Sequence, residues 1–193
     1  MKNATQLTDQ ELVLSYLNGN NHSLSQLIER HKDKIFTSIY MLVKDKYLAE
    51  DLFQDVFIKI IDTLKAGRYN DEGKFLPWAL GIAHNLCVDH FRKVKRSPSI
   101  KTSDNNDIFE VLNFSDAGAE QEIMQGQTRD KIRKMIDLLP EDQREVIILR
   151  NYADLSFKEI ATLTNSSINT CLGRMRYALL NLRKMMTEKQ IAL

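Results

Sequence analysis

The sequence is poor in the residues that interrupt helices. Seven glycines and three prolines make up about 5% of the 193 residues, against roughly 12% in average proteins. Sheet proteins need turn residues between their short strands, so this shortage predicts long helices joined by few connections. The composition therefore indicates an all-α fold.

Cysteines and long apolar runs are also scarce. The two cysteines, Cys87 and Cys171, lie far apart in a chain whose start lacks the basic-then-apolar layout of a signal peptide. We therefore expect reduced thiols in a cytoplasmic protein rather than a disulfide framework. A membrane-spanning helix needs about 18 or more consecutive apolar residues. The chain has no such run, which excludes membrane insertion.

The net charge of +1 conceals an uneven distribution. Residues 1–96 carry 14 basic and 12 acidic side chains, and residues 129–193 carry 12 and 8. Between them, residues 97–128 carry one lysine against six acidic residues. We therefore expect two small helical domains, 1–96 and 128–193, joined by a flexible acidic linker over 97–127. An ordered acidic loop packed on one domain is the alternative.

Apolar spacing places four helices in the first block. A capping box of Thr8 and Glu11 opens a helix over 8–17. Apolar stripes at helical spacing predict further helices over 24–43 and 47–65. A turn-rich loop, 67–77, ends at Pro77, which suits the first turn of a helix over about 78–96. The expected buried face of this last helix is Ala79, Ile82, Ala83, Leu86 and His90 or Phe91.

The second block has the layout of a helix-turn-helix. Pro140 separates two helices, and Ser156 and Glu159 form a capping box that opens a short third one. Residues 164–167 form a turn in which Asn165 can take the left-handed conformation. The final helix, from 168 or 169 to about 186, carries cations and no acidic residue. Such a helix can enter the major groove of DNA. A helical hairpin in an interaction domain is the alternative.

Two further groups of residues in the first block have possible binding roles. Aromatic and basic side chains alternate in the loop and the helix start at Tyr69, Lys74, Phe75 and Trp78, which suits stacking on unpaired bases. The helix then ends in four cations that can hold a phosphate backbone, Arg92, Lys93, Lys95 and Arg96. The alternative makes Phe75 and Trp78 core residues and the cations a solvated helix end.

The aspartates, histidines and cysteine of the first block do not have the spacing of a catalytic or metal site. Asp51 and Asp55 lie at i and i+4, which fits a docking face for a basic partner or a plain solvated face. His84 and Cys87 share a helix face, but His90 lies about 240° away from His84, so the three do not suit one metal ion. The sequence has no phosphate-binding glycine loop and no nucleophile motif. We expect no enzymatic activity, cofactor or metal.

Three segments together resemble the extracytoplasmic-function sigma factors of bacterial RNA polymerase, in the sigma-70 superfamily. AEDLFQDVFIKI (49–60) resembles the region that docks on the polymerase. FLPWALGIAHNLCVDHFRK (75–93) resembles the region that follows it. LPEDQREVIILRNYADLSFKEIATLTNSSINTCLGRMRYALLNLRK (139–184) resembles the promoter-reading domain. All three occur in the family's order around an acidic segment, which makes the likeness more specific than a helix-turn-helix alone.

The resemblance implies a role for each domain and a set of site residues. The first domain would bind the beta-prime clamp helices of core RNA polymerase through Asp51, Gln54 and Asp55. It would also capture melted minus-10 promoter DNA through Tyr69, Asn70, Lys74, Phe75, Trp78, Asn85, Arg92 and Lys93. The second domain would approach the beta subunit flap and read the minus-35 element through Asn169, Thr170, Gly173, Arg174, Arg176 and Tyr177. An anti-sigma factor is the expected regulator, since little sequence precedes the first helix.

The recognition helix departs from the family pattern at three positions. Cys171 and Leu172 stand where the family usually has Lys or Arg, and Gly173 replaces the serine that follows. Leu172 can touch a thymine methyl but has no charge for a phosphate. The main rival to a sigma factor is a stand-alone helix-turn-helix regulator, which would bind operators without polymerase, as a dimer on a palindrome. A metal-dependent nuclease is a more distant rival.

Overall fold

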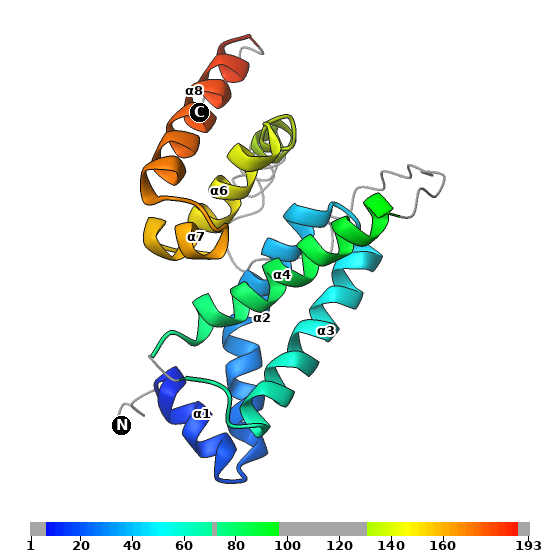
Figure 1. The fold of residues 1–193 in the computed structure, drawn as a ribbon, viewed down its shortest axis with the longest axis vertical. Helices are drawn as coiled ribbons and strands as arrows, with labels where there is room; N and C mark the ends of the chain where they lie inside the picture. The colour runs from blue at the N-terminus through cyan, green and yellow to red at the C-terminus, as the bar shows by residue number, and fades with distance from the viewer. Residues whose placement is uncertain (1–6, 71–72, 97–130, 189–193) are drawn as a thin grey trace, which may run out of the picture. The chain divides into compact units, whose positions relative to one another are not determined.

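A computed structural model describes residues 7–70, 73–96 and 131–188, and every regular element in these ranges is helical. The chain divides into two compact units, Met1–Pro98 and Ser99–Leu193. Figure 1 shows the helices of each unit. The predicted all-α fold is therefore confirmed. The predicted acidic linker, 97–127, lies outside the described residues.

The first unit consists of four helices: α1 (Asp9–Leu17), α2 (Asn21–Val43), α3 (Lys46–Lys65) and α4 (Phe75–Arg96). The predicted capping box is present, because the Thr8 side chain accepts from the Glu11 amide while the Glu11 carboxylate accepts from the Thr8 backbone. Asn20 and Asp45 cap α2 and α3, each through a side-chain oxygen that accepts from an amide of the first turn. These caps satisfy amides that have no partner inside the helix.

The core of this unit is formed where α2, α3 and α4 pack together. Leu27, Ile35 and Ile39 of α2 and Val56 and Ile60 of α3 are all fully buried. The stripe predicted on α3 is confirmed, although its phenylalanines lie at the border of the core. Phe53 packs edge-on against Phe36 and Phe57, with ring centroids 5.6 and 4.9 Å away.

Two predictions about α4 are wrong. The helix begins at Phe75 instead of about residue 78, because a proline is tolerated in a first turn whose amides have no helical partner. The buried face includes Ala79 and Ala83 as predicted, but it is rotated towards Leu80, His84 and Cys87. Leu86 is only half-buried and Phe91 is 40% exposed. The small side chains on the buried face let α4 approach both α2 and α3 closely, which a pattern of large apolar residues does not reveal.

The described part of the second unit consists of helical residues 131–137, α6 (Glu141–Asn151), α7 (Phe157–Leu163) and α8 (Ile168–Glu188). Pro140 occupies the N-cap of α6, and the Ser156–Glu159 capping box opens α7. Asn165 has a φ of 49°, as predicted for the turn before α8. The helix-turn-helix that the sequence predicts is therefore present.

Burial has a chemical consequence for Cys87. Burial raises the pKa of this thiol from 9.0 to about 12, so at pH 8 only about one molecule in ten thousand carries the reactive thiolate. We expect alkylation of Cys87 by iodoacetamide at pH 8 to be at least about a hundredfold slower in the native protein than in urea. Mass spectrometry of the labelled peptide measures this rate. Equal rates would contradict the burial.

The same pKa change makes stability depend on pH. A thiol whose folded-state pKa lies above its unfolded-state value stabilises the fold fully below the unfolded-state value. For Cys87 this contribution is complete below pH 9 and is lost as pH rises towards about 12.

Candidate nucleic-acid interface

The exposed face of α8 brings together most of the predicted minus-35 residues. Asn169, Gly173, Arg176 and Leu180 lie at i, i+4, i+7 and i+11, so they share one side of the helix. Tyr177 lies beside them and is 62% exposed. We call Asn169, Gly173, Arg176, Tyr177 and Leu180 the recognition face. A polar, cationic and aromatic helix face of this kind suits contacts with base edges and phosphates.

The start of α8 is fixed by hydroxyl groups of the preceding turn. The Ser167 hydroxyl oxygen accepts from the Thr170 amide at 3.0 Å and lies 2.8 Å from the Thr170 hydroxyl oxygen. On the other side, the Ser166 hydroxyl lies 3.1 Å from the buried Cys171 sulfur. Cys171, one of the departures from the family pattern, is therefore part of the core, and Thr170 takes part in capping. These contacts set the angle at which the recognition face leaves the domain.

Arg174 occupies a different position from the rest of its predicted group. Its Nε lies 3.2 Å from the Asp142 carboxylate at the start of α6, and its side chain is 27% exposed. The neighbouring Asn181 amide donates to Gln143 of α6 at 2.8 Å. These two contacts join α8 to α6. Sequence spacing could not reveal the Asp142 partner, because the pair joins residues 32 positions apart.

The predicted minus-10 residues of the first unit fall into two groups. The rings of Tyr69 and Trp78 are both half-buried, and their centroids lie 4.4 Å apart. Phe75 packs beneath them, with centroids 5.7 Å from Trp78 and 6.3 Å from Tyr69. Because Phe75 is only 1% exposed, it supports the other two rings from the core and is not available to a base. We call Tyr69, Phe75 and Trp78 the aromatic cluster.

The second group continues from Trp78 along α4. Trp78, Asn85 and Arg92 lie at i, i+7 and i+14, so they share one helix face, and Asn85 and Arg92 are exposed. Lys93 is exposed beside them, while Asn70 and Lys74 are exposed ahead of the helix. Arg92 pairs with Asp89 at 3.3 Å in a fully solvated setting. Such a pair contributes little stability, so the guanidinium can exchange Asp89 for a phosphate.

The exposed face of α3 contains the predicted polymerase-binding residues. Asp51, Gln54 and Asp55 are all exposed there. Two large apolar side chains that the sequence analysis missed share this face, Tyr47 at 79% and Ile58 at 58% exposure. Tyr47, Asp51, Asp55 and Ile58 lie at i, i+4, i+8 and i+11, which places them on one face of a helix. This spacing is the sequence signal that could have revealed Tyr47 and Ile58. We call Tyr47, Asp51, Gln54, Asp55 and Ile58 the docking face.

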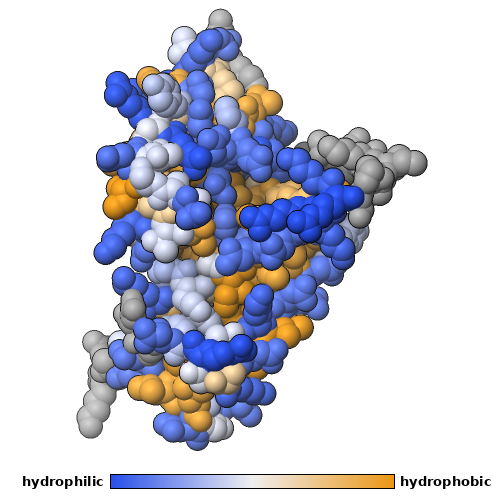
Figure 2. Space-filling view, in the orientation of Figure 1, coloured by the Kyte–Doolittle hydropathy of each residue, from blue (hydrophilic) through white to orange (hydrophobic). Residues whose placement is uncertain are grey.

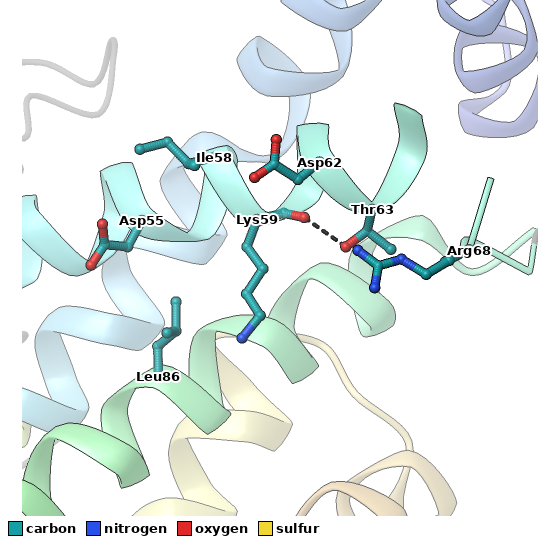
Figure 3. Close-up of a pocket in the computed structure, with 7 residues that line it drawn as sticks. All are labelled: Asp55, Ile58, Lys59, Asp62, Thr63, Arg68 and Leu86. Carbon is teal, nitrogen blue, oxygen red and sulfur yellow. Dashed lines mark hydrogen bonds between the residues drawn. The ribbon is translucent and has the colours of Figure 1, made fainter. Parts of the chain in front are cut away.

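The docking face borders a groove between α3 and α4. The groove has a volume of about 580 Å³ and is lined by Asp55, Ile58, Lys59, Asp62, Thr63, Arg68 and Leu86. Figure 3 shows the Lys59 side chain extending from α3 towards α4, near Leu86. The Thr63 hydroxyl donates to the Lys59 carbonyl at 2.7 Å. The groove is therefore lined by side chains of both charge signs together with two apolar ones, Ile58 and Leu86.

Apolar side chains also reach the surface elsewhere. Figure 2 shows hydrophilic residues over most of the visible face with smaller apolar patches between them. In the parts of the chain that the structure describes, no helix combines the length and the apolar character needed to cross a membrane.

Comparison with known proteins identifies both helical domains. Residues 27–97 match sigma-70 region 2, and residues 129–182 match sigma-70 region 4. These matches define a protein with the two domains of a sigma factor. The chain belongs to the sigma-70 family, in its extracytoplasmic-function group. It is thus a sigma factor for promoter-specific transcription initiation and not an enzyme, which confirms the interpretation of the sequence motifs.

Several curated relatives align over nearly the whole chain. The RNA polymerase sigma-H factor of Pseudomonas aeruginosa is 29% identical over 175 residues, which cover 88% of this chain and 89% of that protein. The ECF RNA polymerase sigma-E factor of Escherichia coli K12 is 29% identical over 176 residues, which likewise cover 88% of this chain and 89% of that protein.

Solved structures share the fold at lower identity. CnrH, in complex with the cytosolic domain of CnrY, matches with a TM-score of 0.65 and 18% identity, over 93% of this chain and 97% of that one. The sigma factor RpoE of Bartonella quintana, in complex with the anti-sigma factor NepR, matches with a TM-score of 0.65 and 19% identity. The match covers 85% of this chain and 96% of that one. At these identities the likeness concerns the fold.

Proposed function

We propose that the two domains divide promoter recognition between them. The domain spanning 128–193 reads the minus-35 element through the recognition face, Thr170 and Arg174. The domain spanning 1–96 holds melted minus-10 DNA, and the linker 97–127 joins the two. The observation that carries this proposal is that exposed Asn169 and Arg176 share one side of α8 with half-buried Gly173, on a helix whose first turn is capped by Ser167. A helix of this kind presents its first turns to the major groove.

We propose that strand capture uses Tyr69 and Trp78 as a stacking platform. Their adjacent, half-buried rings expose aromatic surface on which an unpaired base can stack. Asn70 and Lys74 lie close to this platform in the sequence, while Asn85, Arg92 and Lys93 are exposed further along α4. The positive groups along α4 would then follow the phosphate backbone away from the captured base.

We propose that polymerase binding and regulation use other surfaces. The docking face meets the beta-prime clamp helices, with its carboxylates opposite basic residues and with Tyr47 and Ile58 supplying apolar contact. The second domain lies against the beta subunit flap. An anti-sigma factor holds the protein inactive in the cytoplasm, a proposal supported by the anti-sigma complex in which a structural neighbour was solved.

Substitution of Arg174 tests the reading of minus-35 DNA. We expect Arg174→Ala to weaken discrimination at one base pair by about 1–3 kcal/mol, roughly 5- to 150-fold, because a bidentate contact to a base is lost. The matched control is Asp142→Asn, which removes the ion pair but keeps the guanidinium. Competition between promoter variants for holoenzyme measures the effect. If the control alone reproduces the loss, Arg174 acts by joining α8 to α6 and not by contacting a base.

Run-off transcription tests the proposed function as a whole. Purified core polymerase is supplied with a promoter library, with and without this protein. We expect promoter-dependent transcripts only when the protein is present, and their start sites define the minus-35 and minus-10 elements. Tight operator binding by the isolated protein, without any such transcripts, would instead favour the stand-alone regulator.

A further inference from the structure

A hydrogen-bonded network fastens α1 to α2 at the edge of the first domain. The Asp9 carboxylate uses both oxygens, one 2.6 Å from Arg30 Nη1 and the other 2.8 Å from His31 Nε2. Arg30 Nη2 also donates to the Leu7 carbonyl at 2.7 Å. The Asp9 side chain is 22% exposed and that of His31 is 10% exposed. Partial burial makes these contacts worth more than a solvated ion pair.

The buried end of this network meets the aromatic cluster. The His31 ring packs against the Phe75 ring, with centroids 5.6 Å apart and planes inclined by 34°. Phe75 is in turn the ring that supports both Tyr69 and Trp78. A continuous series of contacts therefore joins α1, through Asp9, His31 and Phe75, to the two rings that expose stacking surface. The links from Asp9 to His31 and from His31 to Phe75 are not visible as a sequence pattern, because each joins two different helices.

We propose that His31, held in place by Asp9, is a positioning residue for strand capture. Its ring acts on Phe75, and Phe75 keeps the Tyr69 and Trp78 rings in the geometry that receives a base. A preformed platform loses less conformational freedom on binding than one that must be assembled around the DNA. This inference rests on the proposed role of the aromatic cluster in strand capture, and it extends the promoter-opening site to α1 and α2.

Two substitutions at His31 separate its ring from its hydrogen bond. His31→Gln keeps an N–H donor for Asp9 but removes the ring, whereas His31→Phe keeps a ring against Phe75 but removes the donor. If the ring does the positioning, His31→Gln should lower promoter opening by holoenzyme at least fivefold, and His31→Phe should keep at least half of it. The reverse order would overturn the proposal, because it would assign the effect to the hydrogen bond alone.

The single tryptophan of the chain supplies a direct readout. Since this tryptophan is Trp78, its fluorescence in the free protein reports on the aromatic cluster alone. We expect acrylamide to quench Trp78 more strongly in His31→Gln than in the wild type, and about equally in His31→Phe and the wild type. Glu29→Gln is the control, because it breaks the exposed Glu29–Lys32 pair on the same helix and should change neither quenching nor opening.

The outcomes distinguish this inference from the proposed function. If Trp78→Ala holoenzyme opens promoters normally, the role of the aromatic cluster itself is wrong. If Trp78→Ala fails to open while His31→Gln opens normally with unchanged quenching, only the positioning role is wrong. If His31→Gln does not fold, Phe75→Leu tests the same proposal, because it removes the ring through which His31 acts. Normal opening by a folded Phe75→Leu variant would equally overturn the proposal.

Discussion

Reversing the charge of both Asp51 and Asp55 should prevent stable assembly with core RNA polymerase. Both carboxylates are exposed on the docking face, where the proposed partner surface is basic. Placing like charges opposite each other at an interface costs several kcal/mol. We therefore expect Asp51→Lys with Asp55→Lys to lower the affinity for core polymerase by roughly a hundredfold or more. Titration of labelled protein with core polymerase measures this change.

A matched control is available on α2. Glu29 and Asp33 are also exposed and also lie at i and i+4, so Glu29→Lys with Asp33→Lys makes the same change in net charge away from the docking face. We expect this variant to bind core polymerase within about threefold of the wild type, since exposed single charges outside an interface act mainly through screened long-range attraction. Equal affinities for both double variants would make the acidic face of α3 an ordinary solvated surface.

Replacing Trp78 by alanine should leave holoenzyme on duplex promoter DNA but impair strand opening. Stacking of one base on an aromatic side chain is worth about 1–3 kcal/mol, so opening should fall by roughly 5- to 150-fold. The recognition face and the docking face belong to α8 and α3 and keep their side chains in this variant. Permanganate footprinting of the minus-10 region measures the bubble, and a gel-shift assay measures duplex binding.

Trp78→Phe controls for lost packing in that experiment. Trp78 contacts both Tyr69 and Phe75, so its removal also weakens the cluster around it. Phenylalanine keeps a stacking ring, and we expect it to retain most of the opening activity. A normal bubble with Trp78→Ala would contradict the proposed platform. An equal loss in both variants, accompanied by a lower melting temperature, would assign the residue to the core.

The parts of the fold that local sequence could predict are those set by local physics. The capping boxes at Thr8 and Ser156 join residues three positions apart, and the left-handed Asn165 depends on its own backbone. Helical period likewise predicts the stripe on α3 and the position of α8. Each of these features is decided within about two helical turns, so a single sequence is sufficient.

The parts that it could not predict depend on which helix packs against which. For Phe75 the sequence left base stacking and core packing both open, and its burial follows because α4 begins at that residue. Arg174 has the spacing of a base-reading residue, and its ion pair with Asp142 becomes visible only once α6 lies beside α8. His31 is a polar residue in a helix until the contacts with Asp9 and Phe75 are known.

The open space around Gly173 has a consequence for how promoter preference can diverge. Apart from its chain neighbours and the backbone of its own helix, a Cβ at this position would have no atom of the described residues within 4 Å. Any other common residue except proline would raise helix propensity by up to about 1 kcal/mol. The fold therefore has room for a Cβ at this position of the recognition face. Under the proposed reading of minus-35 DNA by this face, a single codon change at Gly173 would alter the target sequence while leaving the core and the docking face as they are.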